Sequence, residues 1–192
     1  MRADEDAKSD PASGPLMDVQ DLAFVRHALA LKHEVRQGWR RAGITRPESV
    51  ADHTWGVSLL VLLASRGSDD ATARQALEMA ILHDVAEAIT GDRVPGEYVD
   101  RAAKLAAEDE ALRTMLAGVS PATRAHVRAL LDELEAQDSA AARLVKAADK
   151  AEMGLMADLY EHAGRAPAAA LAEFRDSAKR GVRGSAFAAF WQ

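Results

Sequence analysis

Apolar residues recur every three or four positions along most of the chain, as expected for helices that each bury one face. Gly, Pro, Ser and Asp interrupt these stretches at places typical of helix caps and turns. We predict helices over residues 16–34, 49–66, 69–90, 97–117, 120–137, 138–164 and 167–180. The apolar segment FAAFW near the C-terminus is expected to dock back onto them. The pattern therefore predicts an all-α protein.

The connection at residues 35–48 differs from the other connections in its charge. It contains the arginines Arg36, Arg40, Arg41 and Arg46 in a chain whose net charge is -6. Long loops on a rigid scaffold often carry binding or catalytic residues. We interpret this segment as an irregular loop that carries functional residues.

Composition supports the helical prediction and excludes several function classes. The 192 residues suit one domain, and the apolar 48% is mostly Ala and Leu, with aromatic residues at only 5%. The acidic balance argues against a nucleic-acid polymer as partner, because duplex binding needs a coherent basic face. With no cysteine, any metal must be held by His and carboxylate groups.

The first residues have the composition of a disordered leader. Residues 1–15 are polar, charged and contain Pro and Gly, without the apolar core of a secretory signal. The longest apolar stretch, residues 57–64, is too short to cross a bilayer. We expect a disordered leader over 1–15, a folded domain over 16–192, no membrane partner and a soluble cytoplasmic protein.

The dipeptide His83-Asp84 places two potential metal ligands next to each other inside the predicted third helix. Neighbouring helical positions lie about 100° apart around the axis, so both side chains can reach an ion over that edge. Glu87 follows one turn later. Apolar residues one turn away indicate that the pair faces the core, where an ionised carboxylate needs a compensating cation or several donors.

Two more inward residues have ligand-type side chains. His53 shares a helix face with Val57 and neighbouring apolar residues, although a lone inward histidine is more often part of the core than a ligand. Asp149 lies in the apolar stripe of Val145 and Met153 and therefore needs a partner, either a lysine or a metal ion.

Together, His53, His83, Asp84 and Asp149 come from three predicted helices. Two imidazoles and two carboxylates suit a single divalent ion such as Mn, Co, Fe, Zn or Mg, and the sequence does not identify which. If the ion is octahedral, two positions remain for water and a substrate oxygen, as hydrolysis requires.

The order H…HD…D resembles that of the HD-domain metal-dependent phosphohydrolases. The segments LKHEVRQGW, PESVADHTW, ALEMAILHDVAEAITGD and KAADKAEM are similar to the 5'-deoxynucleotidase branch of that superfamily. This resemblance implies a helical HD-type bundle, a homodimer, and hydrolysis of nucleoside 5'-monophosphates, with deoxynucleotides preferred, to nucleoside and phosphate.

The resemblance also implies roles for further residues. Arg36 and Trp39 match positions that recognise phosphate and nucleotide, and Glu87 and Asp92 match catalytic positions. Arg36 offers a bidentate fork for phosphate, although a solvated loop arginine is the alternative. Trp39 could stack on the substrate or pack into the core. The intervening Gln37-Gly38 departs from the adjacent Arg-Trp pair of the family.

Other activities fit the sequence less well. A guanosine tetraphosphate hydrolase would have a second acid after Glu87, where this chain has Ala88. A two-metal phosphodiesterase would need further histidines after HD, and His126 and His162 stand in no ligand motif. An HD-fold nucleotide-binding regulator without turnover is a third alternative, although Glu87 and Asp92 argue against it.

Overall fold

The computed structural model describes residues 18–94, 97 and 100–191 of the chain. Its α-helices are α1 (Leu22–Ala28), α2 (Gln37–Arg41), α3 (Val50–Ala64), α4 (Asp70–Leu82), α5 (Glu87–Thr90), α6 (Arg101–Met115), α7 (Pro121–Ala136), α8 (Ala140–His162) and α9 (Ala168–Gly181). Its 3-10 turns are η1 (Val19–Asp21), η2 (Leu29–Lys32), η3 (Ser65–Gly67) and η4 (Ala188–Trp191). Within these residues no regular strand forms, which confirms the all-α prediction. The leader expected over 1–15 lies outside the described residues.

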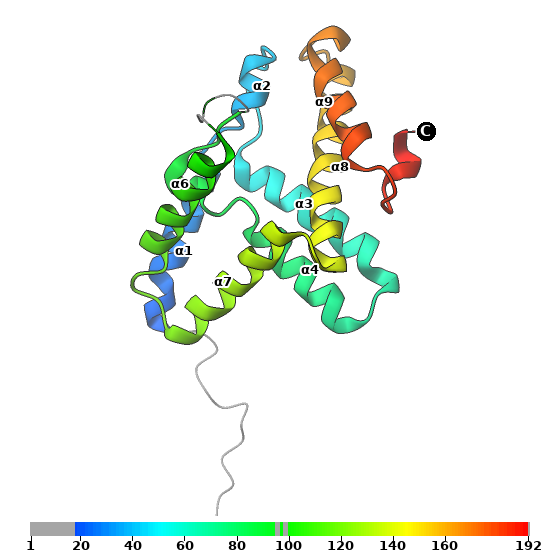
Figure 1. Ribbon diagram of the computed structural model, residues 1–192. Coiled ribbons are helices and arrows are strands. Elements are labelled where there is room, and N and C mark those ends of the chain that lie inside the picture. The colour runs from blue at the N-terminus through cyan, green and yellow to red at the C-terminus, as the bar shows by residue number, and fades with distance from the viewer. Residues whose placement is uncertain (1–17, 95–96, 98–99, 192) are drawn as a thin grey trace, which may run out of the picture.

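The long helix α8 organises the bundle. It packs against α9, α3, α4 and α7, and Figure 1 shows α8 and α9 lying side by side. The central core contains Val57, Met79, Val145 and Ala148 from three of these helices. A second cluster joins α6 and α7 to the segment after α4. The ligand-type residues on α3, on α8 and directly after α4 are therefore held by the most extensively packed part of the fold.

Helix starts follow the predicted capping signals. The Ser49 hydroxyl accepts a hydrogen bond from the Asp52 backbone N–H, and the Asp52 carboxylate accepts one from the Ser49 N–H, which completes a capping box before α3. Ser120 followed by Pro121 opens α7, and Ser139 caps α8. These caps fix the register of α3 and α8 and so the direction of their inward side chains.

The predicted third helix is interrupted, which corrects the expectation that HDVAE lies inside it. Helix α4 ends at Leu82, residues 83–86 form turns, and a separate short helix, α5, begins at Glu87. Backbone bonds from Val85 to Leu82 and from Glu87 to Asp84 span three residues rather than four. Because the backbone is wound more tightly here than in an α-helix, the side chains of His83 and Asp84 are not related by the rotation of about 100° expected from the sequence.

Other elements also differ from the predictions. The described part of the first segment is one short α-helix between two 3-10 turns, and the expected loop at 35–48 contains α2. Helix α6 begins at Arg101, later than predicted. The C-terminal segment does dock as expected, with Phe187 buried and Trp191 packed on the central core. No described helix is both long and apolar enough to span a membrane.

Candidate metal centre

His53 lies on the face of α3 that packs against α8 and is completely buried, with 0% of its surface exposed. Its Nε2 atom is 3.3 Å from Nε2 of His83, 3.5 Å from Oδ1 of Asp149 and 3.7 Å from Oδ2 of Asp84. The structure therefore brings all four predicted ligands together around one edge of the His53 ring.

The surroundings of His53 favour positive charge at this point. Burial alone lowers the pKa of His53, but its hydrogen bonds with Asp149 and Glu152 outweigh burial and raise that pKa to about 10. Glu152 lies behind the ring, where its Oε2 atom is 2.6 Å from Nδ1 of His53.

His83 and Asp84 occupy the turn that follows α4. The Nδ1 atom of His83 is 2.7 Å from the backbone carbonyl of Ala80, so the ring donates there and its Nε2 lone pair is free to point into the cluster. That Nε2 atom is 3.2 Å from Oδ2 of Asp84. Burial alone raises the pKa of Asp84, but the neighbouring His83 and Arg36 outweigh it and hold that pKa below its usual value.

Asp149 reaches the cluster from the middle of α8. Its second oxygen, Oδ2, is 3.1 Å from Nζ of Lys150. Burial raises the pKa of Asp149, but the contact with His53 and the charge of Lys150 outweigh it and lower that pKa well below the usual value. The lysine alternative raised by its sequence position is therefore present at one oxygen, while the other oxygen faces the histidine cluster, where a metal ion stays a prediction.

The donor set fits a divalent cation. Ligand atoms of His53, His83 and Asp84 all lie within 4.8 Å of one another, and Asp149 adjoins His53. Both histidines donate from Nδ1, so both present Nε2 toward the same place, only 3.3 Å apart. Two ring nitrogens that face each other beside carboxylates need positive charge between them, which a proton on His53 supplies in the metal-free protein and a divalent cation can supply in its place.

Arg36 and Asp92 form the rim of this cluster. The Nη1 atom of Arg36 lies 3.2 Å from Oδ1 of Asp92 and 3.4 Å from Oδ2 of Asp84. The other oxygen of Asp92 accepts the backbone N–H of Gln37 at 2.5 Å, and the Asp92 N–H donates to Glu34. Burial lowers the pKa of Arg36, but the adjacent carboxylates raise it above its usual value. Asp92 therefore anchors Arg36 and the start of α2.

Glu87 begins α5, close to the cluster but outside the tight ligand group. Its Oε2 atom is buried and has no hydrogen-bond partner within the described part of the chain. Burial, reinforced by the charges of Asp84 and Asp92, raises the pKa of Glu87 to about 10. A buried carboxyl group with a free oxygen is suited to hold a water molecule or to transfer a proton.

Trp39 packs into the core instead of lining the cluster. Only 2% of its surface is exposed, its ring stacks on Phe174 at 4.2 Å, and Tyr160 meets it edge-on at 5.2 Å. Its indole N–H donates to Oε1 of Glu48 at 2.7 Å. The packing alternative therefore has structural support, and substrate stacking stays a prediction without a supporting contact.

Sequence reasoning missed the carboxylates that support the cluster from behind. Glu152 lies three residues after Asp149 in the same apolar stripe, with Ala148 one turn and Val145 two turns before it. The rule that selected Asp149, an acid among inward apolar residues, would also have selected Glu152. Glu48 and Glu34 carry no such signal, because their roles depend on contacts made across the fold.

The two histidines considered for a two-metal phosphodiesterase, His126 and His162, lie outside the cluster around His53. His126 on α7 pairs with Glu78, and the ring of His162 at the end of α8 bonds to the carbonyl of Asp158. Neither is among the ligand-type groups found within the described residues.

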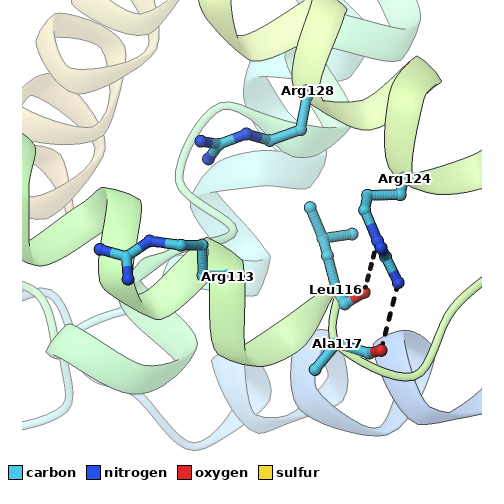
Figure 2. Close-up of a pocket in the computed structure, with 5 residues that line it drawn as sticks. All are labelled: Arg113, Leu116, Ala117, Arg124 and Arg128. Atoms are coloured by element: carbon cyan, nitrogen blue, oxygen red, sulfur yellow. Dashed lines mark hydrogen bonds between the residues drawn. The ribbon is translucent and has the colours of Figure 1, made fainter.

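A separate hollow lies between α6 and α7. It has a volume of about 310 Å³ and, as Figure 2 shows, is lined by Arg113, Leu116, Ala117, Arg124 and Arg128. Its cations are already engaged, because Arg124 donates to the carbonyls of Leu116 and Ala117, and the other two arginines pair with carboxylates. None of the predicted site residues lines this hollow, so it does not compete with the cluster as the candidate site.

Comparisons with known proteins agree with this geometry. The 5'-deoxynucleotidase HDDC2 of Homo sapiens is 33% identical over 156 residues, which cover 81% of this chain and 75% of that protein. A conserved hypothetical protein from Pyrococcus furiosus superposes with a TM-score of 0.71 and 28% identity, over 88% of this chain and 93% of the other. The cyanophage S-2L HD phosphohydrolase DatZ, bound to dA and one catalytic Zn²⁺ ion, superposes with a TM-score of 0.52 and 26% identity. The match covers 84% of this chain and 85% of that one.

A protein-family match covers most of the chain and not only the candidate metal centre. The HD domain family matches residues 28–191, a range that includes the four clustered residues and the segments before and after them. The chain therefore belongs to the HD domain family.

Proposed function

We propose that this protein is a metal-dependent 5'-deoxynucleotidase, which hydrolyses deoxyribonucleoside 5'-monophosphates to a deoxynucleoside and phosphate. The observation that carries the proposal is the convergence of His53, His83, Asp84 and Asp149 on one point, with Arg36 beside it. The relatives named 5'-deoxynucleotidase in several organisms support the substrate class.

The four clustered residues would hold one divalent ion. When bound, such an ion polarises a phosphate oxygen and lowers the pKa of a coordinated water molecule. The mixed nitrogen and oxygen donors suit Mn, Co, Fe or Zn, with Mg a weaker match for imidazoles. The Zn²⁺ ion in DatZ makes zinc a member of that set that deserves direct testing here.

Arg36 would bind the phosphate group. Its guanidinium is planar, largely buried, and aimed at Asp84 on the edge of the cluster. Asp92 holds Nη1 from the side and, through Gln37, fixes the start of α2, so the cation is oriented before substrate arrives. This preorganisation places positive charge where the phosphate accumulates negative charge.

Glu87 and Asp92 would handle the proton. In hydrolysis a water oxygen forms a bond to phosphorus, the bond from phosphorus to the 5'-oxygen breaks, and that oxygen gains a proton. The free Oε2 of Glu87 can orient the water or exchange a proton with it. Asp92 adjoins the phosphate-binding Arg36 and is the second candidate for the transfer to the 5'-oxygen.

The apolar outer face of α3 supports the homodimer expected from the family resemblance. Trp55, Leu59 and Leu62 follow one another at four and three residues, and they are 70%, 40% and 52% exposed. We propose that a second copy of the chain covers this stripe. Light scattering after size exclusion should give the mass of two chains, and Leu62→Glu should reduce it to one. The cytoplasmic location expected from the sequence stays a prediction.

Phosphate release from a panel of deoxy- and ribonucleoside 5'-monophosphates tests the activity. Chelated protein should be inactive, and one added metal among Mn, Co, Mg or Zn should restore release that favours deoxynucleotides. Asp84→Ala should lose metal binding and reduce turnover on the order of 10⁴-fold or more, because the ion loses a ligand. Asp70→Ala, which removes an exposed acid at the start of α4, should change neither.

Two results would contradict the proposal. An Asp84→Ala protein with full metal content and full activity would exclude the assigned cluster. Metal binding without phosphate release from any nucleotide of the panel would favour the alternative of an HD-fold nucleotide-binding regulator or of another substrate, such as guanosine tetraphosphate.

A further inference from the structure

The most deeply buried acidic residue in the described part of the chain has no part in the mechanism above. Glu152, on α8, exposes 6% of its surface. A carboxylate with so little access to water is costly unless strong donors compensate it. Its principal donor is a residue of the candidate metal centre, which gives this burial a functional interpretation.

The contact joins Glu152 to the rear edge of the His53 ring. Oε2 of Glu152 lies 2.6 Å from Nδ1 of His53, at the distance of a strong charge-assisted hydrogen bond. With one proton held on Nδ1, the Nε2 atom on the opposite edge, which faces His83, Asp84 and Asp149, is the nitrogen that can give up its proton and bind a metal ion. Glu152 therefore determines both the tautomer and the orientation of the histidine.

Helix α3 makes room for this carboxylate at Gly56. A Cβ atom at position 56 would lie 2.9 Å from both Cγ and Oε1 of Glu152, closer than real Cβ atoms approach other groups. Gly56 stands one turn after His53, in a helix interior where glycine is less favourable than alanine by about 1 kcal/mol. Gly56 therefore weakens helix α3 slightly but leaves the space that the Glu152 carboxylate occupies.

Glu48 also lies next to the Glu152 carboxylate. Ligand atoms of Glu48, His53 and Glu152 lie within 4.8 Å of one another. Glu48 is itself fixed by the Trp39 indole N–H, which donates to its Oε1 atom at 2.7 Å. Glu152 is therefore the acid of this group that contacts Nδ1 of His53 directly.

We propose that Glu152 is a positioning residue for the metal centre, which strengthens metal binding by holding His53 through Nδ1 and increasing the donor strength of Nε2. The proposal rests on the proposed function only in assigning His53 as a ligand. A carboxylate behind a metal-bound histidine typically strengthens metal affinity by about 10- to 100-fold.

The test measures the affinity of chelated protein for Co²⁺ by titration against a competing chelator, with the visible Co²⁺ spectrum as a second readout. Glu152→Gln keeps an oxygen that can accept the Nδ1 proton but removes the charge. Its Kd for Co²⁺ should rise about 10- to 100-fold, and the absorption bands should shift because the ligand field of His53 changes. Glu173→Gln, which removes the same charge from an exposed position on α9, should leave both unchanged.

A second variant reaches the same contact without altering a charge. Gly56→Ala should displace the Glu152 carboxylate and weaken Co²⁺ binding by a similar factor. If both changes act through one contact, the double variant should bind no more weakly than Glu152→Gln alone. Circular dichroism and urea unfolding establish that each variant is folded under the conditions of the titration.

The outcomes separate this inference from the proposed function. Wild-type affinity and an unshifted spectrum in folded Glu152→Gln would overturn the role of Glu152, whatever the enzyme's substrate. Additive weakening in the double variant would also overturn it, because it would show two independent effects. Strong Co²⁺ binding that depends on Glu152 but supports no nucleotide hydrolysis would keep this inference and reject the deoxynucleotidase activity.

Discussion

The two edges of the His53 ring face regions of opposite character. The front cluster, comprising His83, Asp84, Asp149, Arg36 and Glu87, has excess carboxylates, a histidine nitrogen that faces Nε2 of His53, and a buried carboxyl oxygen with no partner among the described residues. The rear cluster, comprising Glu152, Glu48 and Trp39, is internally satisfied, since its donors and acceptors meet within 2.6 to 2.7 Å. The front is completed only by a cation and a substrate, whereas the rear is complete on folding.

This difference separates function from stability. Natural sites often accept unfavourable groups that the surrounding fold must offset. Changes at the front should therefore reduce turnover strongly. They should also change the stability of the metal-free protein: loss of a cation should lower it, and loss of a buried acid should raise it. Changes at the rear should alter stability by the same amount whether or not metal is bound, with a sign that depends on the group removed.

Of the four changes that compare the two clusters, Arg36→Met should give the largest effect, and it tests the front cluster directly. Loss of the guanidinium removes the phosphate-binding cation, and kcat/KM should fall about 10²- to 10³-fold. The metal-free variant should also unfold at lower urea, because Asp84 and Asp92 lose their shared cation. Arg40→Met, at an exposed position of the same helix α2, is the control and should keep wild-type values. Full activity in Arg36→Met would remove Arg36 from the site.

Glu87→Gln should produce the second largest loss of activity but the opposite change in stability. Turnover should fall about 10²-fold if Glu87 exchanges a proton with the attacking water. Because the folded-state pKa of Glu87 is raised to about 10, its contribution to stability is lost as pH rises from the unfolded value toward 10. At pH 8 the metal-free Gln variant should therefore be more stable than wild type. Lower stability in urea unfolding would contradict this description of the front cluster.

The sequence identified the front cluster better than the rear. Inward acids and histidines are visible as breaks in an apolar stripe, which is how Asp84 and Asp149 were found, and the helices that carry His53 and Asp149 start at clear caps. The turn at His83 was not predictable from periodicity, because Ile81 and Val85 continue the helical spacing through it. Its backbone instead adopts bonds that span three residues.

The orientation of Trp39 shows a second limit of sequence reasoning. Whether this ring faces a ligand or the core depends on Tyr160 and Phe174, which lie more than 120 positions later in the chain. Glu48 is hidden for the same reason, since its partners Trp39 and Tyr160 come from other elements. The spacing of apolar and polar residues along one helix does not predict contacts between residues far apart in the sequence.

Trp39→Phe tests whether the rear cluster is structural. The smaller ring removes the donor to Glu48 and leaves a buried acceptor unsatisfied, so the free energy of unfolding should fall by about 2 kcal/mol. The loss should be the same with and without metal, and KM for a deoxynucleotide should stay near wild type in the folded fraction. A large rise in KM at unchanged stability would instead establish the substrate contact expected from the sequence.

Glu48→Gln should have the smallest effect of the four near pH 5, and the growth of that effect with pH makes it diagnostic. The folded-state pKa of Glu48 is about 7, above its usual value near 4.5, because burial and Glu152 oppose its charge. For an acid with a raised folded-state pKa, the stability it contributes is present below the unfolded value and lost as pH rises through the folded value. The Gln variant cannot ionise. Its advantage over wild type should therefore grow between pH 4.5 and 7 and reach on the order of 2 kcal/mol.

Urea unfolding of chelated protein at pH 5 and pH 8 measures this difference, with Glu173→Gln as the exposed control. A pH-independent difference would mean that Glu48 ionises as freely in the fold as in the unfolded chain, so that two negative charges would stand behind His53. The rear cluster would then be as unbalanced as the front. A difference that grows with pH would instead show that the surroundings behind His53 oppose a charge on Glu48, as expected if the rear cluster is complete on folding and only the front needs a cation.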